Sequence, residues 1–167
     1  MDEIVNKVAA SGLVTINLEE LYPQGERISI DLADQLWQGL ALKEKDFRAW
    51  IADHDWSQYT QKHVAVFCSV DAILPAWSFM LVTSALSEFA PTVVHGNRQQ
   101  LEEVLFWRVV ESLDLETYRD KRCVIKGCNH LPVPQSAYSN LVVKLRPVAR
   151  SIMFGEPCST VPVFKRV

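Results

Sequence analysis

Three of the four cysteines in this chain stand where a short apolar segment gives way to a turn. They are Cys68 after residues 64–67, Cys128 after residues 124–127, and Cys158 shortly after residues 152–154. Apolar segments of this length indicate strands, and the carboxyl ends of parallel strands share the edge of a sheet where ligands bind. We therefore expect the three thiols to meet in space and to hold a metal ion or a cluster.

Thiolate sulfur binds zinc and iron strongly, and imidazole can complete the ligand set. The expected cofactor is zinc or an iron–sulfur cluster, with Cys68, Cys128 and Cys158 as three of its ligands. The candidates for the fourth position are His95, His130, Asp71 and water. The chain contains no Cys-x-x-Cys pair, so its spacing is not that of a zinc finger.

Two other interpretations of the thiols remain open. One cysteine could react covalently, as in a thiol-dependent enzyme or a sulfur carrier. Cys68 precedes an expected helix, whose positive end would favour a thiolate, and Cys128 has Lys126 and His130 nearby. Alternatively, the protein is an interaction scaffold whose cysteines are buried and inert. Strand alternation places Cys123 on the face opposite Cys128, which predicts that Cys123 is a core residue.

Composition indicates an ordinary globular protein. The 167 residues are 49% hydrophobic and 22% charged, which fits one domain over residues 1–167. A net charge of −3 argues against general nucleic-acid binding, which needs a concentrated basic face. The positive residues near expected element ends are interpreted as solvated charge; they are Lys121, Arg122, Lys126, Arg146 and Arg150.

The chain shows no sign of secretion or membrane insertion. It begins Met1-Asp2-Glu3, whereas a signal peptide begins with positive charge. The longest uncharged stretch, residues 72–87, is shorter than the roughly 20 residues of a membrane-spanning helix. We therefore expect a cytoplasmic protein, in which thiols stay reduced. A protein partner or a homo-oligomer is left open.

Strand and helix patterns alternate along the second part of the chain. Strands are expected at residues 63–67, 92–95, 122–127 and 151–154. A helix over residues 72–89 would begin at Asp71, another at a capping box formed by Asn97 and Gln100, and a third would end at Pro147. The first 60 residues are less regular, with strands at 14–18 and 27–31 and a helix over 42–52. This order predicts a single α/β domain with a mainly parallel central sheet flanked by helices.

Several motifs of the chain also carry a family resemblance. They are Asp55-Trp56-Ser57-Gln58-Tyr59, Lys126-Gly127-Cys128 and Gly155-Glu156-Pro157-Cys158-Ser159-Thr160. Together they resemble an uncharacterised bacterial family, the domain of unknown function 2480 family, nearly from end to end. The resemblance implies no assigned activity and no established catalytic residue. Because members of this family tend to be encoded near iron–sulfur assembly genes, it implies a role in handling iron, sulfur or clusters.

Overall fold

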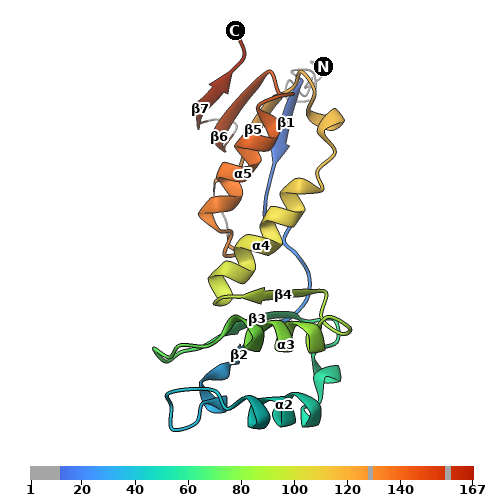
Figure 1. The fold of residues 1–167 in the computed structure, drawn as a ribbon. Coiled ribbons are helices and arrows are strands. Elements are labelled where there is room, and N and C mark those ends of the chain that lie inside the picture. The colour runs from blue at the N-terminus through green and yellow to red at the C-terminus, as the bar shows by residue number, and fades with distance from the viewer. Residues whose placement is uncertain (1–11, 128–129, 157–158) are drawn as a thin grey trace, which may run out of the picture. The chain divides into compact units, whose positions relative to one another are not determined.

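The computed structural model describes residues 12–127, 130–156 and 159–167, which fall into two compact units. Unit 1 comprises Met1–Pro23 and Phe106–Val167, and unit 2 comprises Gln24–Leu105. The chain therefore begins in unit 1, builds unit 2 and returns to unit 1. Each unit has its own sheet and its own core, and each is described by itself (Figure 1).

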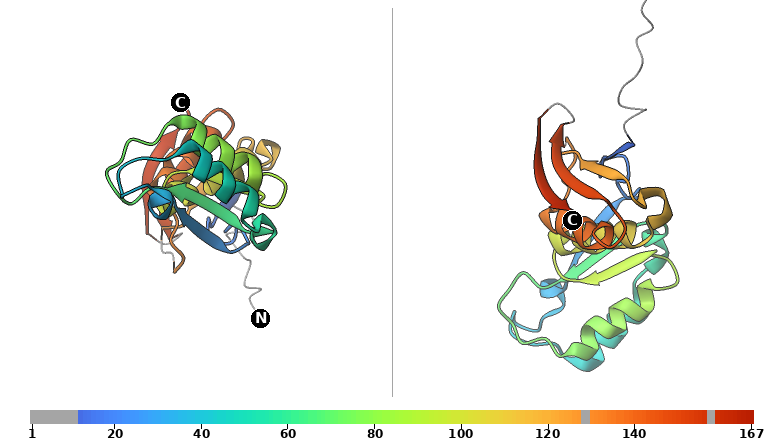
Figure 2. Two further views of the ribbon diagram at one scale, coloured as in Figure 1. Left: turned by 60° about the horizontal axis from the view of Figure 1, so that its bottom comes forward. Right: turned by 90° about the horizontal axis from the view of Figure 1, so that it is seen from above.

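Unit 2 contains a three-stranded parallel sheet in the order β2-β3-β4. Its elements are β2 (Arg27–Asp31), η1 (Leu32–Gln35), α2 (Glu44–Asp53), η2 (Trp56–Tyr59), β3 (His63–Phe67), α3 (Ala76–Leu86) and β4 (Thr92–His95). Successive strands run in the same direction, so each connection crosses over through a helix. Figure 2 shows α2 and α3 side by side on one face of this sheet.

The central strand of unit 2 is buried on both faces, as is usual in parallel sheets. Val64 and Val66 belong to the core formed with α2 and α3. Ala65 points the other way and packs against Leu101 and Leu105 of α4 (Arg98–Glu111). The alternation explains why β3 consists of small and branched apolar residues between His63 and Phe67.

Helix α4 begins at the expected capping box. The amide of Asn97 donates to Gln100 Oε1 (2.8 Å), and the amide of Gln100 donates to Asn97 Oδ1 (3.0 Å). These bonds satisfy two backbone donors that the first helical turn would otherwise leave without a partner. The boundary between the two units falls inside this helix.

Unit 1 contains a four-stranded sheet in the order β1-β5-β6-β7. Its elements are β1 (Leu13–Ile16), η3 (Leu115–Tyr118), β5 (Arg122–Ile125), α5 (Gln135–Leu145), β6 (Ser151–Glu156) and β7 (Ser159–Lys165). β1, β5 and β6 are parallel, and β7 is antiparallel to β6. The core on one face includes Phe106 of α4, Leu141 and Leu145 of α5, and Ile125 of β5.

The α/β class with mainly parallel strands is confirmed, but the strands form two sheets and not one central sheet. β1 pairs with β5 (Val14 with Cys123), while β2, β3 and β4 pair among themselves. Alternation of strands and helices fixes the direction of a connection, and it does not say which strands share hydrogen bonds. A single domain over residues 1–167 stays a prediction.

The structure differs from the expected elements at two places, the start of α3 and the strand β7. Helix α3 begins at Ala76, with Pro75 at its N-cap, so the prediction that Asp71 caps this helix is wrong. Residues that precede a proline disfavour the helical conformation, which keeps the segment before Pro75 extended. β7 was not among the expected strands; it contains Pro162, which is tolerated there since β7 is an edge strand. Within the described residues, no helix is both long and apolar enough to cross a bilayer.

Candidate metal site at the carboxyl edge of the four-stranded sheet

Three parallel strands of unit 1 end side by side. Ile16 of β1 pairs with Ile125 of β5, which lies next to Phe154 of β6. The segments that follow these residues therefore leave the sheet from one edge. Because each segment starts within one strand spacing of the next, about 4.8 Å, residues far apart in sequence are brought together there.

A carboxylate ties two of these segments together. Glu19, shortly after β1, accepts hydrogen bonds from the backbone amides of His130 and Leu131. Asn17 fixes the turn that carries Glu19, because its Oδ1 accepts from the Glu19 amide at 3.1 Å. Backbone donors directed at a carboxylate make charge-assisted hydrogen bonds, which are stronger than neutral ones. The chain just after Cys128 is thus anchored to the end of β1.

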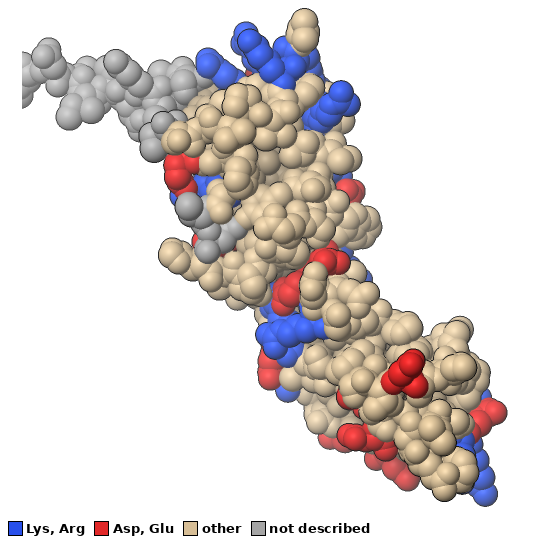
Figure 3. Space-filling model, turned by 90° about the vertical axis from the view of Figure 1, so that its left-hand side faces the viewer, with Lys and Arg blue, Asp and Glu red and all other residues tan. Residues whose placement is uncertain are grey.

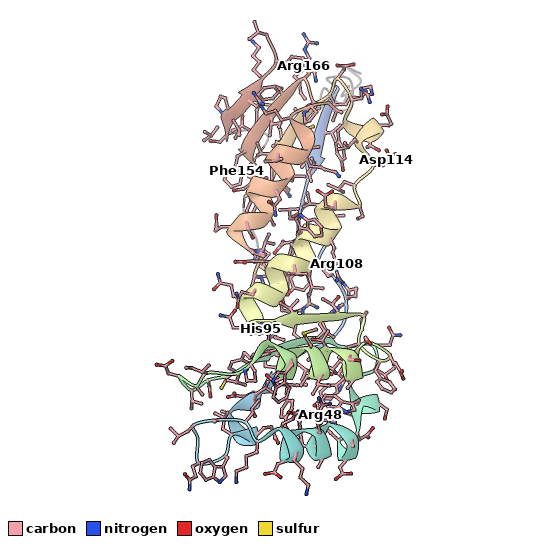
Figure 4. The ribbon with its side chains drawn as sticks, viewed as in Figure 1. Arg48, His95, Arg108, Asp114, Phe154 and Arg166 are labelled. Carbon is pink, nitrogen blue, oxygen red and sulfur yellow. The ribbon has the colours of Figure 1, made fainter. Side chains whose placement is uncertain are left out.

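A depression of about 340 Å³ lies beside this anchor. Its wall is built around Phe154, whose ring meets the ring of Tyr138 edge-on at 5.7 Å. The same phenyl ring covers Gly127, where an added Cβ would come within 2.5 Å of Phe154 Cζ. Residues that complete the wall are Leu131, Pro132, Val133 and Gln135. Gly127 therefore lets the end of β5 pass close under an aromatic ring (Figure 4 labels Phe154).

Two of the three expected ligands, Cys128 and Cys158, lie outside the described residues. The strand register nevertheless fixes where their segments begin. Cys128 follows β5, and Cys158 follows β6, the parallel neighbour of β5. Their segments therefore follow neighbouring parallel strands of one sheet, and a shared site for the two cysteines stays a prediction.

Cys68 has a different setting, because it follows β3 in the sheet of unit 2. Its half-buried thiol donates to the carbonyl oxygen of Val70 at 3.5 Å. Helix α3 begins only at Ala76, so the expectation that a helix N-terminus follows Cys68 directly is wrong. β3 belongs to a different sheet from β5 and β6, so Cys68 does not share their sheet edge, and a common site for Cys128 and Cys158 stays a prediction.

The expected fourth ligands also separate between the units. His95, at the end of β4, stacks on Phe79 with ring centroids 3.6 Å apart, and Asp71 lies in the loop before α3. His130 is exposed and belongs to unit 1. Among the described residues, which exclude Cys128 and Cys158, no three His, Cys, Asp or Glu side chains are grouped as a metal site.

Sequence reasoning missed the anchoring role of Glu19 and the aromatic wall at Phe154. A signal for the first was present, since an Asn directly after a strand, here Asn17, is typical of an Asx turn. The second had no local signal. The ring of Phe154 reaches Gly127 only because β6 and β5 pair in this register.

A groove of about 710 Å³ lies along α3 in unit 2. It is lined by Leu74, Ala76, Phe79, Met80, Thr83, Ser84, Ser87 and His95. His95 is the one titratable side chain among these lining residues, and aromatic stacking already occupies a face of its ring. We therefore assign no chemistry to this groove, although its volume exceeds that of the depression beside Phe154.

Cys123 is a core residue, as its strand position indicated. It is 0% exposed, and burial raises the pKa of its thiol to about 11. At pH 8 only about one thiol in a thousand would be ionised, so Cys123 should resist alkylation in the folded protein. Mass spectrometry after brief iodoacetamide treatment, with and without denaturant, measures this protection. Rapid modification of native Cys123 would contradict the burial.

The same raised pKa makes stability depend on pH. A free cysteine thiol ionises near pH 8.5, so the stabilisation from buried, protonated Cys123 is complete below about pH 8.5 and is lost as the pH rises toward 11. By pH 10 the free energy of unfolding should have fallen by about 2 kcal/mol from this group alone. Urea titrations of the Cys123→Ala variant should show a correspondingly flatter decline over this range.

These features define an α/β protein with a candidate ligand site at the carboxyl edge of its four-stranded sheet. The chain matches the family described as Protein of unknown function (DUF2480) over residues 2–166, and it belongs to that family. No curated protein and no solved structure matches it. The family assignment confirms the resemblance carried by the sequence motifs.

Proposed function

We propose that this protein is a cytoplasmic accessory protein that binds zinc or an iron–sulfur cluster through cysteine thiolates. The observation that carries the proposal is the parallel pairing of β5 with β6. Ile125 lies beside Phe154, so the segments of Cys128 and Cys158 leave neighbouring strands at one edge. Two thiols supplied by adjacent strand ends would provide two of the thiolate ligands that zinc and iron sites commonly use.

Other groups at this edge support a metal site. His130 follows Cys128 closely, and an imidazole is a suitable third ligand for zinc. The carboxylate of Glu19 holds the backbone at His130 and Leu131, which fixes the chain beside the proposed ligands. Holding the chain in advance lowers the conformational entropy lost when a metal binds. In this proposal the remaining coordination position is filled by water or by a partner's group.

The association with iron–sulfur assembly would follow from the same chemistry. Soft thiolates suit both zinc and iron–sulfur clusters, so the residues alone do not choose between the two. An accessory protein of this kind would hold its cargo at an exposed sheet edge, from which a partner could take it. The assignment to iron–sulfur assembly has two supports. One is the family resemblance, and the other is that two cysteines follow neighbouring strands.

Metal analysis of the untagged, anaerobically purified protein tests the proposal. We expect about one zinc ion or one cluster per chain, and at least a tenfold loss of bound metal in the Cys128→Ser and Cys158→Ser variants. The Cys123→Ala variant is the control, because Cys123 is a core residue and should leave the metal content unchanged. The Cys68→Ser variant shows whether the third expected cysteine contributes.

The outcomes separate the alternatives. Wild-type protein that stays free of zinc and iron after anaerobic reconstitution would rule out the metal function. Equal metal content in wild type and in both the Cys128 and Cys158 variants would also rule out these ligands. One cysteine that alkylates rapidly near neutral pH, without protection by metal, would support a thiol-dependent enzyme or sulfur carrier instead.

A further inference from the structure

Three positive residues far apart in sequence meet at the amino edge of the four-stranded sheet in unit 1. The amide of Arg150 donates to the carbonyl oxygen of Lys121 at 2.8 Å, and the amide of Arg166 donates to the carbonyl oxygen of Arg150 at 2.9 Å. Lys121, Arg150 and Arg166 therefore form one row across three adjacent strand ends. All three side chains are exposed.

The neighbouring row of the sheet is also positive. Arg122 of β5 pairs with Ser151 of β6, which pairs with Lys165 of β7. Five of the six positions in the two rows thus carry a positive charge. Successive residues of a strand point to opposite faces, so the two rows flank this edge of the sheet from its two sides. We call these five residues the basic edge: Lys121, Arg122, Arg150, Lys165 and Arg166. Lys and Arg side chains gather at this end of unit 1 in Figure 3, and Figure 4 labels Arg166 there.

Little negative charge compensates the basic edge. Asp120 pairs with Arg166 at 3.1 Å. Among the described residues no carboxylate pairs with Lys121, Arg122, Arg150 or Lys165. Like charges held this close repel one another and destabilise the folded state. The chain as a whole carries a net charge of −3, so the positive charge is concentrated against an acidic background.

We propose that the basic edge binds the phosphodiester backbone of a nucleic acid. Neighbouring strands are about 4.8 Å apart, and the long Lys and Arg side chains can spread from them onto successive phosphates. Arginine, which supplies three of the five cations, also binds phosphate through paired N–H donors. Phosphate contacts carry no base information, so binding through these cations does not depend on base sequence.

The arrangement favours a phosphodiester chain over other polyanions. An extended acidic peptide places successive side chains on opposite sides, so only every second carboxylate faces a given row of these cations. A nucleic-acid strand carries one charge in every unit. Stable docking on a bilayer uses an apolar insertion as well as charge, and the sixth position of the two rows is Ser151.

This binding should depend strongly on salt. Each phosphate contact with a single strand contributes about −0.7 to the slope of log K against log salt concentration. With three to five contacts the slope should lie between about −2 and −3.5. Two oligonucleotides of equal length and different sequence should bind within about threefold of each other, because phosphate contacts carry no base information.

Fluorescence anisotropy of a labelled single-stranded RNA oligonucleotide with the full-length protein tests the proposal. The variant Arg150→Ala/Lys165→Ala removes two exposed cations that have no ion-pair partner among the described residues. At 0.1 M salt we expect about 25-fold weaker binding and a slope reduced in magnitude by about 1.4. The control is Lys45→Ala/Arg48→Ala on α2, which removes the same charge from exposed positions in unit 2.

The control variant should bind within about twofold of wild type if the basic edge, and not net charge, carries binding. Unchanged thermal unfolding of both variants shows that folding is intact. The proposal is overturned if wild type does not bind the oligonucleotide at 50 mM salt, or if both variants lose affinity equally. It is likewise overturned if polyglutamate or vesicles with anionic lipids bind the basic edge more tightly than the oligonucleotide does.

Discussion

Replacing Glu102 with alanine should destabilise unit 2 by about 3–5 kcal/mol. Glu102 accepts from Arg27 through both carboxylate oxygens, with Nε to Oε1 at 2.7 Å and Nη2 to Oε2 at 3.2 Å. The side chains of Arg27 and Glu102 are 6% and 9% exposed. Arg27 also donates to the carbonyl oxygen of Gly25. Removal of the carboxylate would take away the counter-charge that Glu102 supplies to a buried guanidinium.

Urea unfolding followed by tryptophan fluorescence measures this loss, because Trp50, Trp56 and Trp77 all lie in unit 2. The matched control is Glu44→Ala, which breaks the exposed pair of Glu44 with Arg48 on α2 and should cost less than about 1 kcal/mol. If the two variants unfold at the same urea concentration, the ion pair between β2 and α4 does not stabilise the unit.

The double variant Arg27→Met/Glu102→Leu separates the ion pair from its packing. Well-packed apolar residues often replace a buried pair at little cost, because no charge is then left without a partner. We therefore expect the double variant to be more stable than Glu102→Ala. A double variant that is less stable would indicate that the hydrogen bond from Arg27 to Gly25 contributes as much as the charge pair.

The second large effect is expected for Gly155→Ala, at about 3 kcal/mol. Gly155 has φ +124°, a conformation that residues with a side chain rarely adopt. An added Cβ would also lie 2.5 Å from the carbonyl oxygen of Ser159 across the hairpin of β6 and β7. The opposing atom belongs to the backbone, so relief requires a shift of β7 and not the rotation of a side chain.

Gly12→Ala provides the matched control within unit 1. Gly12 also has a positive φ (+64°), yet within the described part of the chain nothing lies within 4 Å of an added Cβ. Its cost should be only the conformational one, about 1 kcal/mol. Thermal unfolding of the two variants compares them directly. If both variants lose the same thermal stability, the close approach of Gly155 to Ser159 adds nothing to the cost of the backbone conformation.

The sequence was sufficient to locate most elements. Strands at residues 27–31, 63–67 and 92–95 were expected with the bounds that the structure gives. Apolar residues in short runs specify strands, and the capping box of Asn97 and Gln100 specifies a helix start, because both depend on neighbouring residues. The core position of Cys123 followed from alternation along β5 for the same reason.

Elements whose limits depend on distant contacts were harder to place. Helix α3 was expected to start at Asp71, a favourable capping residue, but it starts at Ala76 after Pro75. β7 contains Pro162, which argues against a central strand and says nothing against an edge strand. Pro162 is acceptable in β7 because, within the described residues, β7 pairs with β6 on one side and has no strand on its other side.

The pairing of strands was decided by the tertiary structure. The alternation of strands and helices along the chain led to the expectation of one sheet. In the structure β1 pairs with β5, so the chain completes unit 2 between the two strands. Backbone hydrogen bonds between strands carry no signature of side-chain type, so no local pattern could distinguish one sheet from two.

By itself, the sequence determined the α/β class, most element bounds and the position of Cys123, because these depend on local propensity and periodicity. The tertiary structure decided which residues become neighbours. It paired β5 with β6, from which the segments of Cys128 and Cys158 continue, and it left Cys68 after a strand of the other sheet. It also assembled the basic edge from three separate stretches of an acidic chain. Register between strands is a long-range property, and these juxtapositions exist only once the sheets form.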